Sequence, residues 1–353
     1  MSPNAALNTT CPRPPIYVRL PNWVGDVCMS LPSLEALLAT DRPIVVCARP
    51  WARELLSGYP LAGFIDMTDG WRANASAVRR HRREQVFTHP PGGPDRPIQD
   101  VGLLLPDSLS SALSFRLAGL HCAGYRDDGR SLILHWPLRK PKPAIHAVAS
   151  WWHLTRLSLQ AWGLPVPAES PPPQLHLRST RSQVEATERL LHEHNLTPGN
   201  FVLIAPTATG LHHGRIKIWP GFAELTRTLQ DQGLAVVMCP PPSEAEQALR
   251  NAPTARCLPP LPLGAFATLS RQAALVICND SGVSHLAAAV QAPQLTLFGV
   301  TRRERTGPWS PKADCLGTED QWPDIETVLR AALVRLNGTV AAPGPESNAN
   351  PAA

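Results

Sequence analysis

The sequence predicts an α/β protein made of two Rossmann-like domains, each built on a parallel sheet. Short apolar runs alternate with helical patterns along the whole chain of 353 residues, which is typical of βαβ units. A segment with five prolines near the middle interrupts this alternation, which then restarts. Because proline at that density stiffens the chain and bars regular structure, we interpret the segment as a linker between two domains.

The first half contains five short apolar runs that predict strands. These runs are Ile16–Leu20, Ile44–Ala48, Phe64–Met67, Val101–Leu105 and Leu132–Leu134. Helical patterns lie near Leu31–Ala39, Ala73–Gln85, Ser110–Leu117 and Val148–Trp162. We therefore expect an N-terminal domain over residues 16–163, preceded by a flexible polar segment at residues 1–15.

The proline-rich linker, residues 164–174, leads into a second half that repeats the alternation. Its predicted strands are Phe201–Ala205, Ala235–Cys239, Leu275–Cys278 and Leu295–Phe298. Its predicted helices are Arg181–His194, Gly221–Asp231, Glu244–Arg250, Val283–Val290 and Asp324–Leu336. These elements predict a C-terminal domain over residues 175–337, and the small, polar residues 338–353 predict a disordered tail.

The bulk composition indicates a globular protein that suits acidic partners. Hydrophobic residues make up 43% of the chain, charged residues make up 17%, and the net charge is +5. Such a charge suits a nucleotide, a phosphorylated glycolipid or an anionic membrane face, whereas no nucleic-acid-binding motif is found. Because no uncharged apolar segment reaches about 18 residues, we expect any membrane contact to be peripheral.

The eight cysteines are scattered singly and form no CxxC pair. This pattern is typical of reduced, mostly buried thiols rather than of disulfides or a zinc site. The polar N-terminus also lacks the apolar core of a secretory signal. We therefore expect a cytoplasmic protein.

The most informative motif is the polar turn at residues 279–285, which lies between an apolar run and an alanine-rich run. A strand, a tight turn and a helix start are the parts from which proteins build phosphate sites. The backbone N–H groups of Ser281 and Gly282 would point out of the helix start, where the helix dipole favours an anion. The alternative is that Asp280 or Ser281 only caps the helix.

A second motif, residues 19–26, follows the first predicted strand and ends in Gly25 and Asp26. Ligands of open α/β sheets bind beyond the carboxyl ends of the strands, so Asp26 would lie at such a crevice. A carboxylate there can take a proton from an attacking hydroxyl, and the alternative is that Asp26 caps the following helix. Neither half has a GxGxxG turn or a GxxxxGK[ST] loop, which disfavours dinucleotide oxidoreductases and P-loop NTPases.

Residues 16–32 and 279–299 resemble the two signature blocks of the ADP-heptose:lipopolysaccharide heptosyltransferases. Shorter blocks at residues 103–108, 111–113, 124–126 and 129–131 resemble the heptosyltransferase II branch. The similarity keeps the family's order over roughly residues 16–336. It implies a GT-B fold, in which two Rossmann-like domains face each other across a cleft and bind the acceptor and the nucleotide sugar respectively.

The resemblance also implies inversion at the anomeric carbon, with ADP-heptose as the donor substrate and with neither a metal nor another cofactor. The sequence agrees, because it contains no Asp-x-Asp pair of the type that holds a divalent cation under a diphosphate. By the family pattern Asp26 is the general base. The residues implied to bind the donor are Lys217, Asp280, Ser281, Gly282 and His285.

Two of these assignments have alternatives. A carboxylate beside a diphosphate would repel it, so we expect Asp280 to order the turn or to contact sugar hydroxyls. Lys217 could instead be an exposed surface lysine. The segment before Lys217 also departs from the family pattern, because Pro206 leads into residues 207–214 where the family has a glycine-containing turn.

Further contacts follow from the other matching blocks. The hydroxyls of Thr207 and Thr209 could bind phosphate, and Glu244 aligns with a glutamate that contacts the nucleotide. Arg126 and Arg130 are implied to bind the acceptor, since arginine pairs bidentately with phosphates and carboxylates.

Two segments of the first half have no clear place in the family pattern. The cluster at residues 79–83 is either a solvated helix face or a contact for anionic lipid or acceptor. The segment at residues 86–100, rich in Pro and Gly, predicts an extra loop.

We therefore expect an inverting glycosyltransferase that moves L-glycero-D-manno-heptose from its ADP-activated form to the lipopolysaccharide inner core, at the cytoplasmic face of the inner membrane. Its partners would be the nucleotide-sugar donor and an anionic core glycolipid, with no nucleic acid. Two alternatives stay open. One is a relative that uses the same donor on a protein or another surface glycan. The other is a catalytically silent nucleotide-sugar-binding partner.

Overall fold

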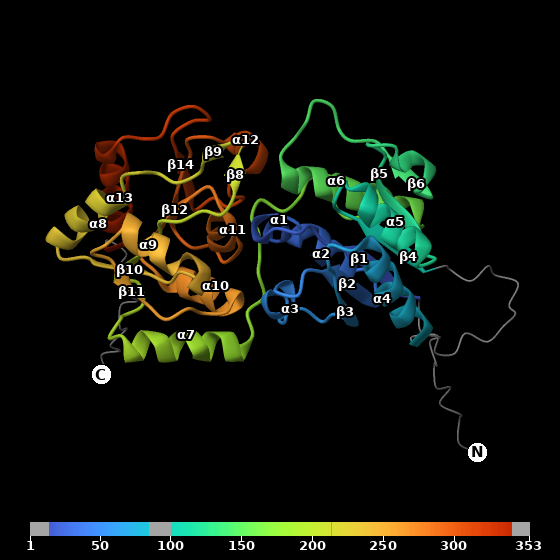
Figure 1. Ribbon diagram of the computed structural model, residues 1–353, viewed down its shortest axis with the longest axis horizontal. Helices are drawn as coiled ribbons and strands as arrows, with labels where there is room; N and C mark the ends of the chain where they lie inside the picture. The colour runs from blue at the N-terminus through green and yellow to red at the C-terminus, as the bar shows by residue number, and fades with distance from the viewer. Residues whose placement is uncertain (1–13, 85–99, 213, 341–353) are drawn as a thin grey trace, which may run out of the picture. The chain divides into compact units, whose positions relative to one another are not determined.

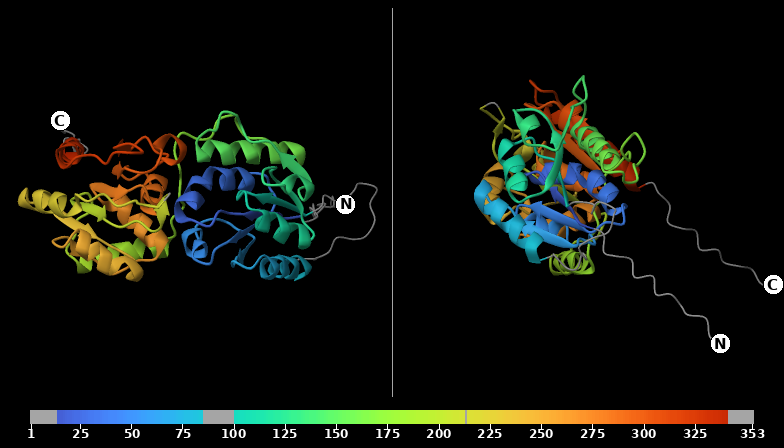
Figure 2. Two further views of the ribbon diagram at one scale, coloured as in Figure 1. Left: turned by 45° about the horizontal axis from the view of Figure 1, so that its top comes forward. Right: turned by 90° about the vertical axis from the view of Figure 1, so that its right-hand side faces the viewer.

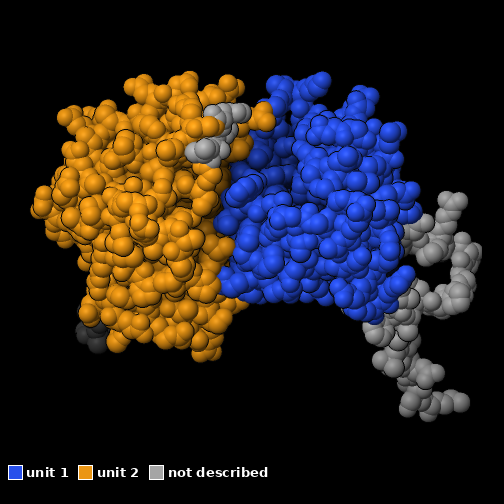
Figure 3. Space-filling view, viewed as in Figure 1, with its two compact units in different colours: residues 1–172 blue, residues 173–353 orange. Residues whose placement is uncertain are grey.

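The computed structural model describes residues 14–84, 100–212 and 214–340. The chain divides into two compact units, Met1–Pro172 and Pro173–Ala353, coloured blue and orange in Figure 3. Most of the N-terminal segment predicted to be flexible, most of the predicted extra loop at residues 86–100 and residues 341–353 of the predicted tail lie outside the described residues.

The first unit is built on a parallel sheet of six strands in the order β3-β2-β1-β4-β5-β6. In chain order the strands are β1 (Ile16–Arg19), β2 (Ile44–Ala48), β3 (Gly63–Asp66), β4 (Val101–Leu104), β5 (His121–Tyr125) and β6 (Trp136–Leu138). The two central strands, β1 and β4, are buried along their whole length. Strands that are covered on both faces read as continuous apolar runs, which is the pattern seen in the sequence.

Helices cover both faces of this first sheet (Figures 1 and 2). They are α1 (Val24–Met29), α2 (Leu31–Leu38), α3 (Ala52–Leu55), α4 (Trp71–Glu84), α5 (Leu109–Leu117) and α6 (Ala147–Ala161), with a 3₁₀ turn, η1, at Arg130–Leu132. The helices α4 and α5 pack together over a core that includes Tyr17, Val45 and Phe115. Helices α2 and α6 pack against each other in a separate contact.

The second unit repeats this plan with the strand order β11-β10-β7-β12-β13-β14. Its parallel strands are β7 (Phe201–Ala205), β10 (Ala235–Met238), β11 (Arg256–Cys257), β12 (Leu275–Asn279), β13 (Gln294–Leu297) and β14 (Ala313–Leu316). A separate antiparallel hairpin is formed by β8 (Leu211–His212) and β9 (Arg215–Ile216).

The helices of the second unit also cover both faces of its sheet (Figures 1 and 2). They are α7 (Arg181–Glu193), α8 (Phe222–Asp231), α9 (Ala245–Asn251), α10 (Leu263–Gln272), α11 (Gly282–Ala289), α12 (Arg303–Thr306) and α13 (Ile325–Val340), with a 3₁₀ turn, η2, at Pro242–Glu244. Helices α8 and α13 share one apolar core with the sheet, whereas α7 packs on α10 and α10 on α11. Helix α13 reaches Val340, three residues into the segment predicted as a tail.

The structure confirms the predicted α/β class with two Rossmann-like sheets but corrects the end of the first sheet. The predicted strand Leu132–Leu134 is wrong, because residues 130–132 form the turn η1. The strands there are β5 and β6. Strand β5, with the sequence HCAGY, has no β-branched residue, and β6 contains Pro137, so local propensity favours neither. Pairing with β4 in a buried position overrides propensity in β5.

Each sheet has a point at which its strand order reverses, between β1 and β4 in the first unit and between β7 and β12 in the second. Helices that follow the strands on either side of such a point leave the sheet on opposite faces. A crevice therefore opens beyond the carboxyl ends of these strands, and ligands of doubly wound sheets bind there. The polar motifs at residues 19–26 and 279–285 follow β1 and β12, so each motif lies beside one of these two points of reversal.

Candidate active site

In the second unit the turn between β12 and α11 has the geometry of an anion site. Ser281 is the N-cap of α11, and its Oγ accepts a hydrogen bond of 3.4 Å from the backbone N–H of Val283. Within residues 214–340 no hydrogen-bond partner is found for the backbone N–H groups of Ser281 and Gly282. These donors lie at the positive end of the helix dipole, so a negatively charged group is favoured beside them.

Lys217 lies at this turn and adds a full positive charge to it. Its Nζ donates to the backbone carbonyl oxygen of Asp280 at 3.2 Å, and its side chain is only partly exposed. Strand β9 ends at Ile216, so the hairpin β8–β9 leads directly into the lysine. Despite the longer segment after β7, the structure therefore brings Lys217 to the turn, with its side chain partly rather than fully exposed.

Asn279 connects the turn to the segment that carries Lys217. It is fully buried at the end of β12, and its Oδ1 accepts a hydrogen bond of 2.8 Å from the backbone N–H of Trp219. Its Nδ2 donates to the carbonyl oxygens of Ala205 and Thr207 at 3.4 and 3.3 Å. Asn279 was not among the predicted site residues, although an asparagine that ends an apolar strand is a signal that sequence reasoning could have used.

The carboxylate of Asp280 is held inside the fold. The side chain is 7% exposed, and its Oδ2 accepts a hydrogen bond of 2.6 Å from Thr301 Oγ1. Its backbone N–H donates to Leu297, the last residue of β13. Thr301 lies 21 residues further along the chain, and no local sequence pattern marks it as a partner.

The remaining predicted donor contacts differ in exposure. Thr207 is buried, and its hydroxyl donates to the carboxylate of Glu244 in η2, so the structure joins these two residues. Thr209 is exposed on the segment before β8. His285 is 5% exposed in the first helical turns of α11, which places its ring inside the fold rather than at the surface.

The groups around the turn carry charge of both signs. Burial, the largest cause, raises the pKa of the Cys278 thiol to about 12, so this neighbour of the turn is neutral at physiological pH. The carboxylate of Asp280 is held by Thr301 and that of Glu244 accepts from Thr207. The ammonium group of Lys217 and the start of α11 supply positive charge at the turn, whereas the two carboxylates accept hydrogen bonds from hydroxyl groups of the protein.

In the first unit Asp26 lies in the first turn of α1, directly after the loop that follows β1. Its side chain is partly exposed, and the N-cap residue Trp23 has 68% of its surface exposed. Burial and the nearby negative charge of Asp26 both raise the pKa of the Cys28 thiol. A partly exposed carboxylate at the carboxyl end of a central strand can accept a proton from a bound ligand.

The two arginines predicted to bind the acceptor have different surroundings. Arg126 is exposed just after β5. Arg130 is fully buried, and its guanidinium donates to the carbonyl oxygens of Pro106 and Tyr125 and to the carboxylate of Asp107. A side chain enclosed in this way holds the loop after β4 against β5, so direct contact between Arg130 and an acceptor is not supported.

The arginines of the 79–83 cluster lie on the last turns of α4, and two of them have partners in the protein. Arg82 pairs with Asp100 at 2.8 Å and donates to the carbonyl oxygen of Ala118. Arg79 donates to the carbonyl oxygen of Leu117. These bonds satisfy carbonyls at the C-terminal end of α5, so part of the cluster serves a structural role.

Two absences hold for the described part of the chain. Outside residues 1–13, 85–99, 213 and 341–353, no group of three or more His, Cys, Asp and Glu side chains is arranged to hold a metal ion. Over the same residues, no helix has the length and apolar character needed to cross a membrane.

Comparison with known proteins gives a consistent result. The family model described as glycosyltransferase family 9 (heptosyltransferase) matches residues 98–332. The chain is 28% identical over 309 residues to lipooligosaccharide heptosyltransferase 2 of Haemophilus influenzae, covering 83% of this chain and 85% of the relative.

Two solved heptosyltransferase structures are also similar to this chain. The structure of E. coli ADP-heptose lps heptosyltransferase II is 26% identical, with a TM-score of 0.70 over 92% of this chain and 99% of that one. The E. coli heptosyltransferase WaaC with ADP is 19% identical, with a TM-score of 0.66 over 91% and 99%. The second similarity concerns the fold alone.

Thr301→Val tests whether the hydroxyl of Thr301 stabilises the turn. The substitution keeps the size of the side chain but leaves the buried carboxylate of Asp280 without this donor, so we expect the free energy of unfolding to fall by about 1–3 kcal/mol. Thr301→Ser keeps a donor and should recover most of the loss. Chemical denaturation measures both variants. Thr228→Val, which changes a hydroxyl that bonds only within α8, is the control, and an unchanged stability of Thr301→Val would contradict the assignment.

Proposed function

The chain belongs to glycosyltransferase family 9, the heptosyltransferases, and from this membership we propose that it transfers L-glycero-D-manno-heptose from its ADP-activated form to the inner core of lipopolysaccharide. The observation that carries the proposal is the anion site of the second unit, where Lys217 Nζ lies 3.2 Å from the carbonyl oxygen of Asp280 at the start of α11. An ADP diphosphate has the charge and the oxygen acceptors that such a site favours.

Relatives support both the donor and the acceptor. One similar structure, 26% identical to this chain, is that of E. coli ADP-heptose lps heptosyltransferase II. The structure of E. coli heptosyltransferase WaaC holds ADP. The relative from Haemophilus influenzae acts on lipooligosaccharide, as its name states. We infer a core glycolipid as the acceptor of this chain and the cytoplasmic face of the inner membrane as the place of reaction.

In the proposed reaction Asp26 is the general base. Its carboxylate removes the proton from an acceptor hydroxyl, and the resulting oxygen attacks the anomeric carbon of the heptose from the face opposite ADP. The bond from the anomeric carbon to the phosphate oxygen breaks, and ADP leaves with the electron pair. The configuration at the anomeric carbon is therefore inverted.

The charge that develops on departing ADP is met by Lys217 and by the N–H groups of Ser281 and Gly282. Fixed donors at the position where charge develops stabilise a transition state without reorganising. We propose that no metal is required, because a lysine and a helix start supply the positive field that a divalent cation would otherwise supply. Thr209, which is exposed between β7 and β8, is a further proposed phosphate contact.

Other predicted donor residues have supporting roles in the proposal. Asp280 holds the turn through Thr301 and contacts no phosphate, since its carboxylate is already engaged. Glu244 and Thr207 fix the end of β7 relative to η2, next to the place expected for the nucleoside. Arg126, which is exposed at the end of β5, is the proposed acceptor contact of the pair that sequence reasoning selected.

A transfer assay with ADP-heptose and a panel of acceptors tests the function directly. We expect product on truncated core glycolipids and none on protein or on unrelated surface glycans, because the similarity is to enzymes of the core. Mass spectrometry of the acceptor measures the added heptose. Product only on another acceptor would replace the core assignment, and absence of product on every acceptor would favour a silent nucleotide-sugar binder.

Asp26→Ala tests the base. Loss of a general base lowers kcat by about 10²–10⁴-fold, whereas ADP binds to the other unit and its affinity should stay within about twofold. Single-turnover kinetics and calorimetry with ADP separate the two effects. Asp41→Asn is the control, since Asp41 is an exposed carboxylate of the same unit with a φ of 56° that asparagine also tolerates. Retained turnover in Asp26→Ala would rule out this role.

Lys217→Ala tests the anion site. A charge-assisted hydrogen bond contributes about 1.5–3 kcal/mol, so ADP affinity should fall by about 10–100-fold. AMP, which has one phosphate fewer, should lose less. Lys312→Ala removes an exposed lysine of the same unit and should leave both affinities unchanged. Equal ADP affinities in the two variants would show that Lys217 does not meet the diphosphate.

A further inference from the structure

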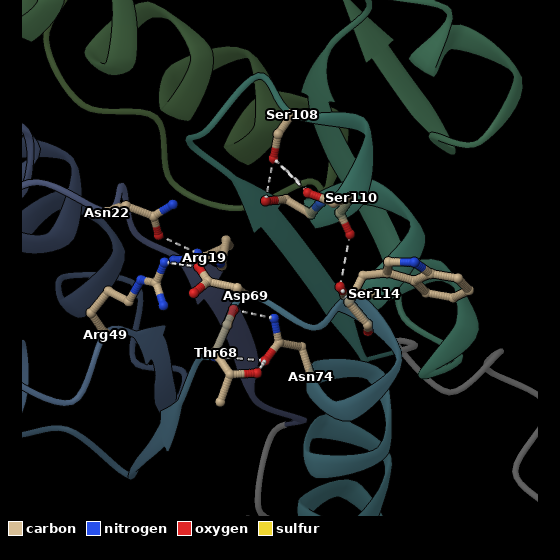
Figure 4. A pocket seen from close by; sticks show the side chains of 11 residues that line it. Arg19, Asn22, Arg49, Thr68, Asp69, Asn74, Ser108, Ser110 and Ser114 are labelled. Carbon is tan, nitrogen blue, oxygen red and sulfur yellow. Dashed lines mark hydrogen bonds and ion pairs between the residues drawn. The ribbon is translucent and has the colours of Figure 1, made fainter.

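The first unit contains a polar pocket of about 90 Å³ that none of the predicted site residues lines (Figure 4). It lies where four neighbouring strands end. Arg19 is the last residue of β1, Arg49 directly follows β2, Thr68 follows β3 by two residues and Ser108 follows β4. The pocket therefore lies at the carboxyl edge of the sheet, beside the point where the strand order reverses, which is the usual ligand position of this architecture.

Arg19 brings a buried positive charge to the pocket. Its side chain is only 5% exposed, and its guanidinium donates to the carbonyl oxygens of Leu20 and Cys47 and, at 2.5 Å, to Asn22 Oδ1. These acceptors are all neutral, and no carboxylate of the described residues forms an ion pair with Arg19. A buried cation without a counter-charge is costly, so an anion from outside the chain would stabilise it.

The charge of Arg19 persists at neutral pH. The pKa of the guanidinium is lowered to about 10, mainly by burial and to a smaller extent by the nearby positive charge of Arg49. An arginine with this pKa is still protonated at pH 7. The pocket is thus cationic under physiological conditions.

The second arginine is already compensated. Arg49 forms an ion pair with Asp69, whose side chain is 90% exposed at the rim. Figure 4 shows the guanidinium groups of Arg19 and Arg49 close together on one side and the serines of α5 on the other. With Asp69 assigned to Arg49, one net positive charge remains in the lining.

Two helix starts add to this field. Ser108 is the N-cap of α5, and Ser110 and Ser111 lie in its first turn. Helix α4 begins at Trp71, which also lines the pocket. The hydroxyl of Ser114 lies within hydrogen-bond distance of the carbonyl oxygens of both Trp71 and Ser110, at 3.1 and 2.7 Å. The positive ends of two helix dipoles are therefore held at the pocket, together with hydroxyl donors.

We propose that this pocket of the first unit binds one oxyanion, a phosphate or carboxylate group of the acceptor glycolipid. Asn22, which bonds to Arg19, lies in the loop before α1, four residues before Asp26 in that helix. An anion in the pocket would therefore anchor the acceptor beside the proposed base. That the anion belongs to the acceptor rests on the proposed function. That the pocket binds an anion does not rest on it.

Ser110→Asp tests the pocket with a variant that should fold. An acidic residue in the first turn of a helix is favourable for the helix, but here its charge would repel an anion in the pocket. Ser182→Asp is a matched control, because Ser182 is also the second residue of a helix, α7, and is likewise exposed. Both serine hydroxyls bond to the hydroxyl of the N-cap residue, Ser108 at 3.3 Å and Thr180 at 3.0 Å.

The measurement is the thermal unfolding of the full chain in inorganic phosphate, with sodium chloride of equal ionic strength as the reference and acetate as a carboxylate probe. Lys217→Ala serves as the background for all variants, so that the anion site of the second unit contributes little. We expect Ser110→Asp to weaken the apparent affinity for phosphate at least about tenfold and Ser182→Asp to leave it unchanged. Acetate and phosphate compared on one protein distinguish a carboxylate from a phosphate site.

Asp69→Asn provides a test in the opposite direction. It removes the exposed carboxylate and releases Arg49, so phosphate should bind about threefold more tightly or better. If phosphate stabilises Ser110→Asp, Ser182→Asp and the background protein equally, the inference is overturned. Arg19 would then serve only to hold the loop after β1 through its bonds to Leu20 and Asn22. Loss of all stabilisation with Lys217→Ala alone would also overturn it, since the ion would then bind only to the second unit.

A kinetic measurement connects the pocket to the acceptor. In the chain with Lys217 intact, Ser110→Asp should raise KM for an anionic acceptor about tenfold and leave KM for ADP-heptose unchanged. An unchanged acceptor KM would contradict an acceptor role. If the wild-type chain transfers no heptose at all, the proposed function fails, while the phosphate measurements still decide whether the pocket binds an anion.

Discussion

The hydrogen bonds of Asn279 are the interaction on which the candidate donor site depends. One fully buried amide accepts from the N–H of Trp219 and donates to the carbonyls of Ala205 and Thr207, so it joins the ends of β7 and β12 to the segment that carries Lys217. A buried polar side chain with these bonds permits one arrangement, because any displacement leaves polar groups unsatisfied. Asn279 therefore helps to fix the position of Lys217, together with the hydrogen bond from Lys217 Nζ to the carbonyl oxygen of Asp280.

The two units share one strand order but carry positive charge in different ways. In the second unit a lysine with a flexible stem reaches the start of α11, and its carbonyl partner leaves the ammonium able to meet a ligand. In the first unit the charge of Arg19 is inside the fold and fixed by three neutral acceptors. A fixed, poorly solvated cation discriminates more strongly between an anion and a neutral ligand, since little water screens it.

Much of the fold could be predicted from the sequence because its strands are buried on both faces. Runs such as Ile44–Ala48 and Phe201–Ala205 are apolar throughout, and the structure has the same bounds. Strand β5 escaped prediction because its residues become a strand only through pairing with β4. At the site, motifs of adjacent residues such as Ser281 and Gly282 were accessible, whereas the partnership of Asp280 with Thr301 and the burial of Arg130 depend on packing between distant segments.

Arg19 is a case in which packing between distant segments decides a functional interpretation. Its neighbours in sequence, Val18 and Leu20, are buried residues of the β1 region, so the local pattern marks it only as a polar residue at a strand end. The charge of Arg19 indicates a ligand site only when β2 and β4 lie beside β1. The guanidinium is then buried near Asp69, but that carboxylate already pairs with Arg49. A cation that is retained under these conditions loses hydration in the folded protein, and an oxyanion ligand is the group that offsets that loss.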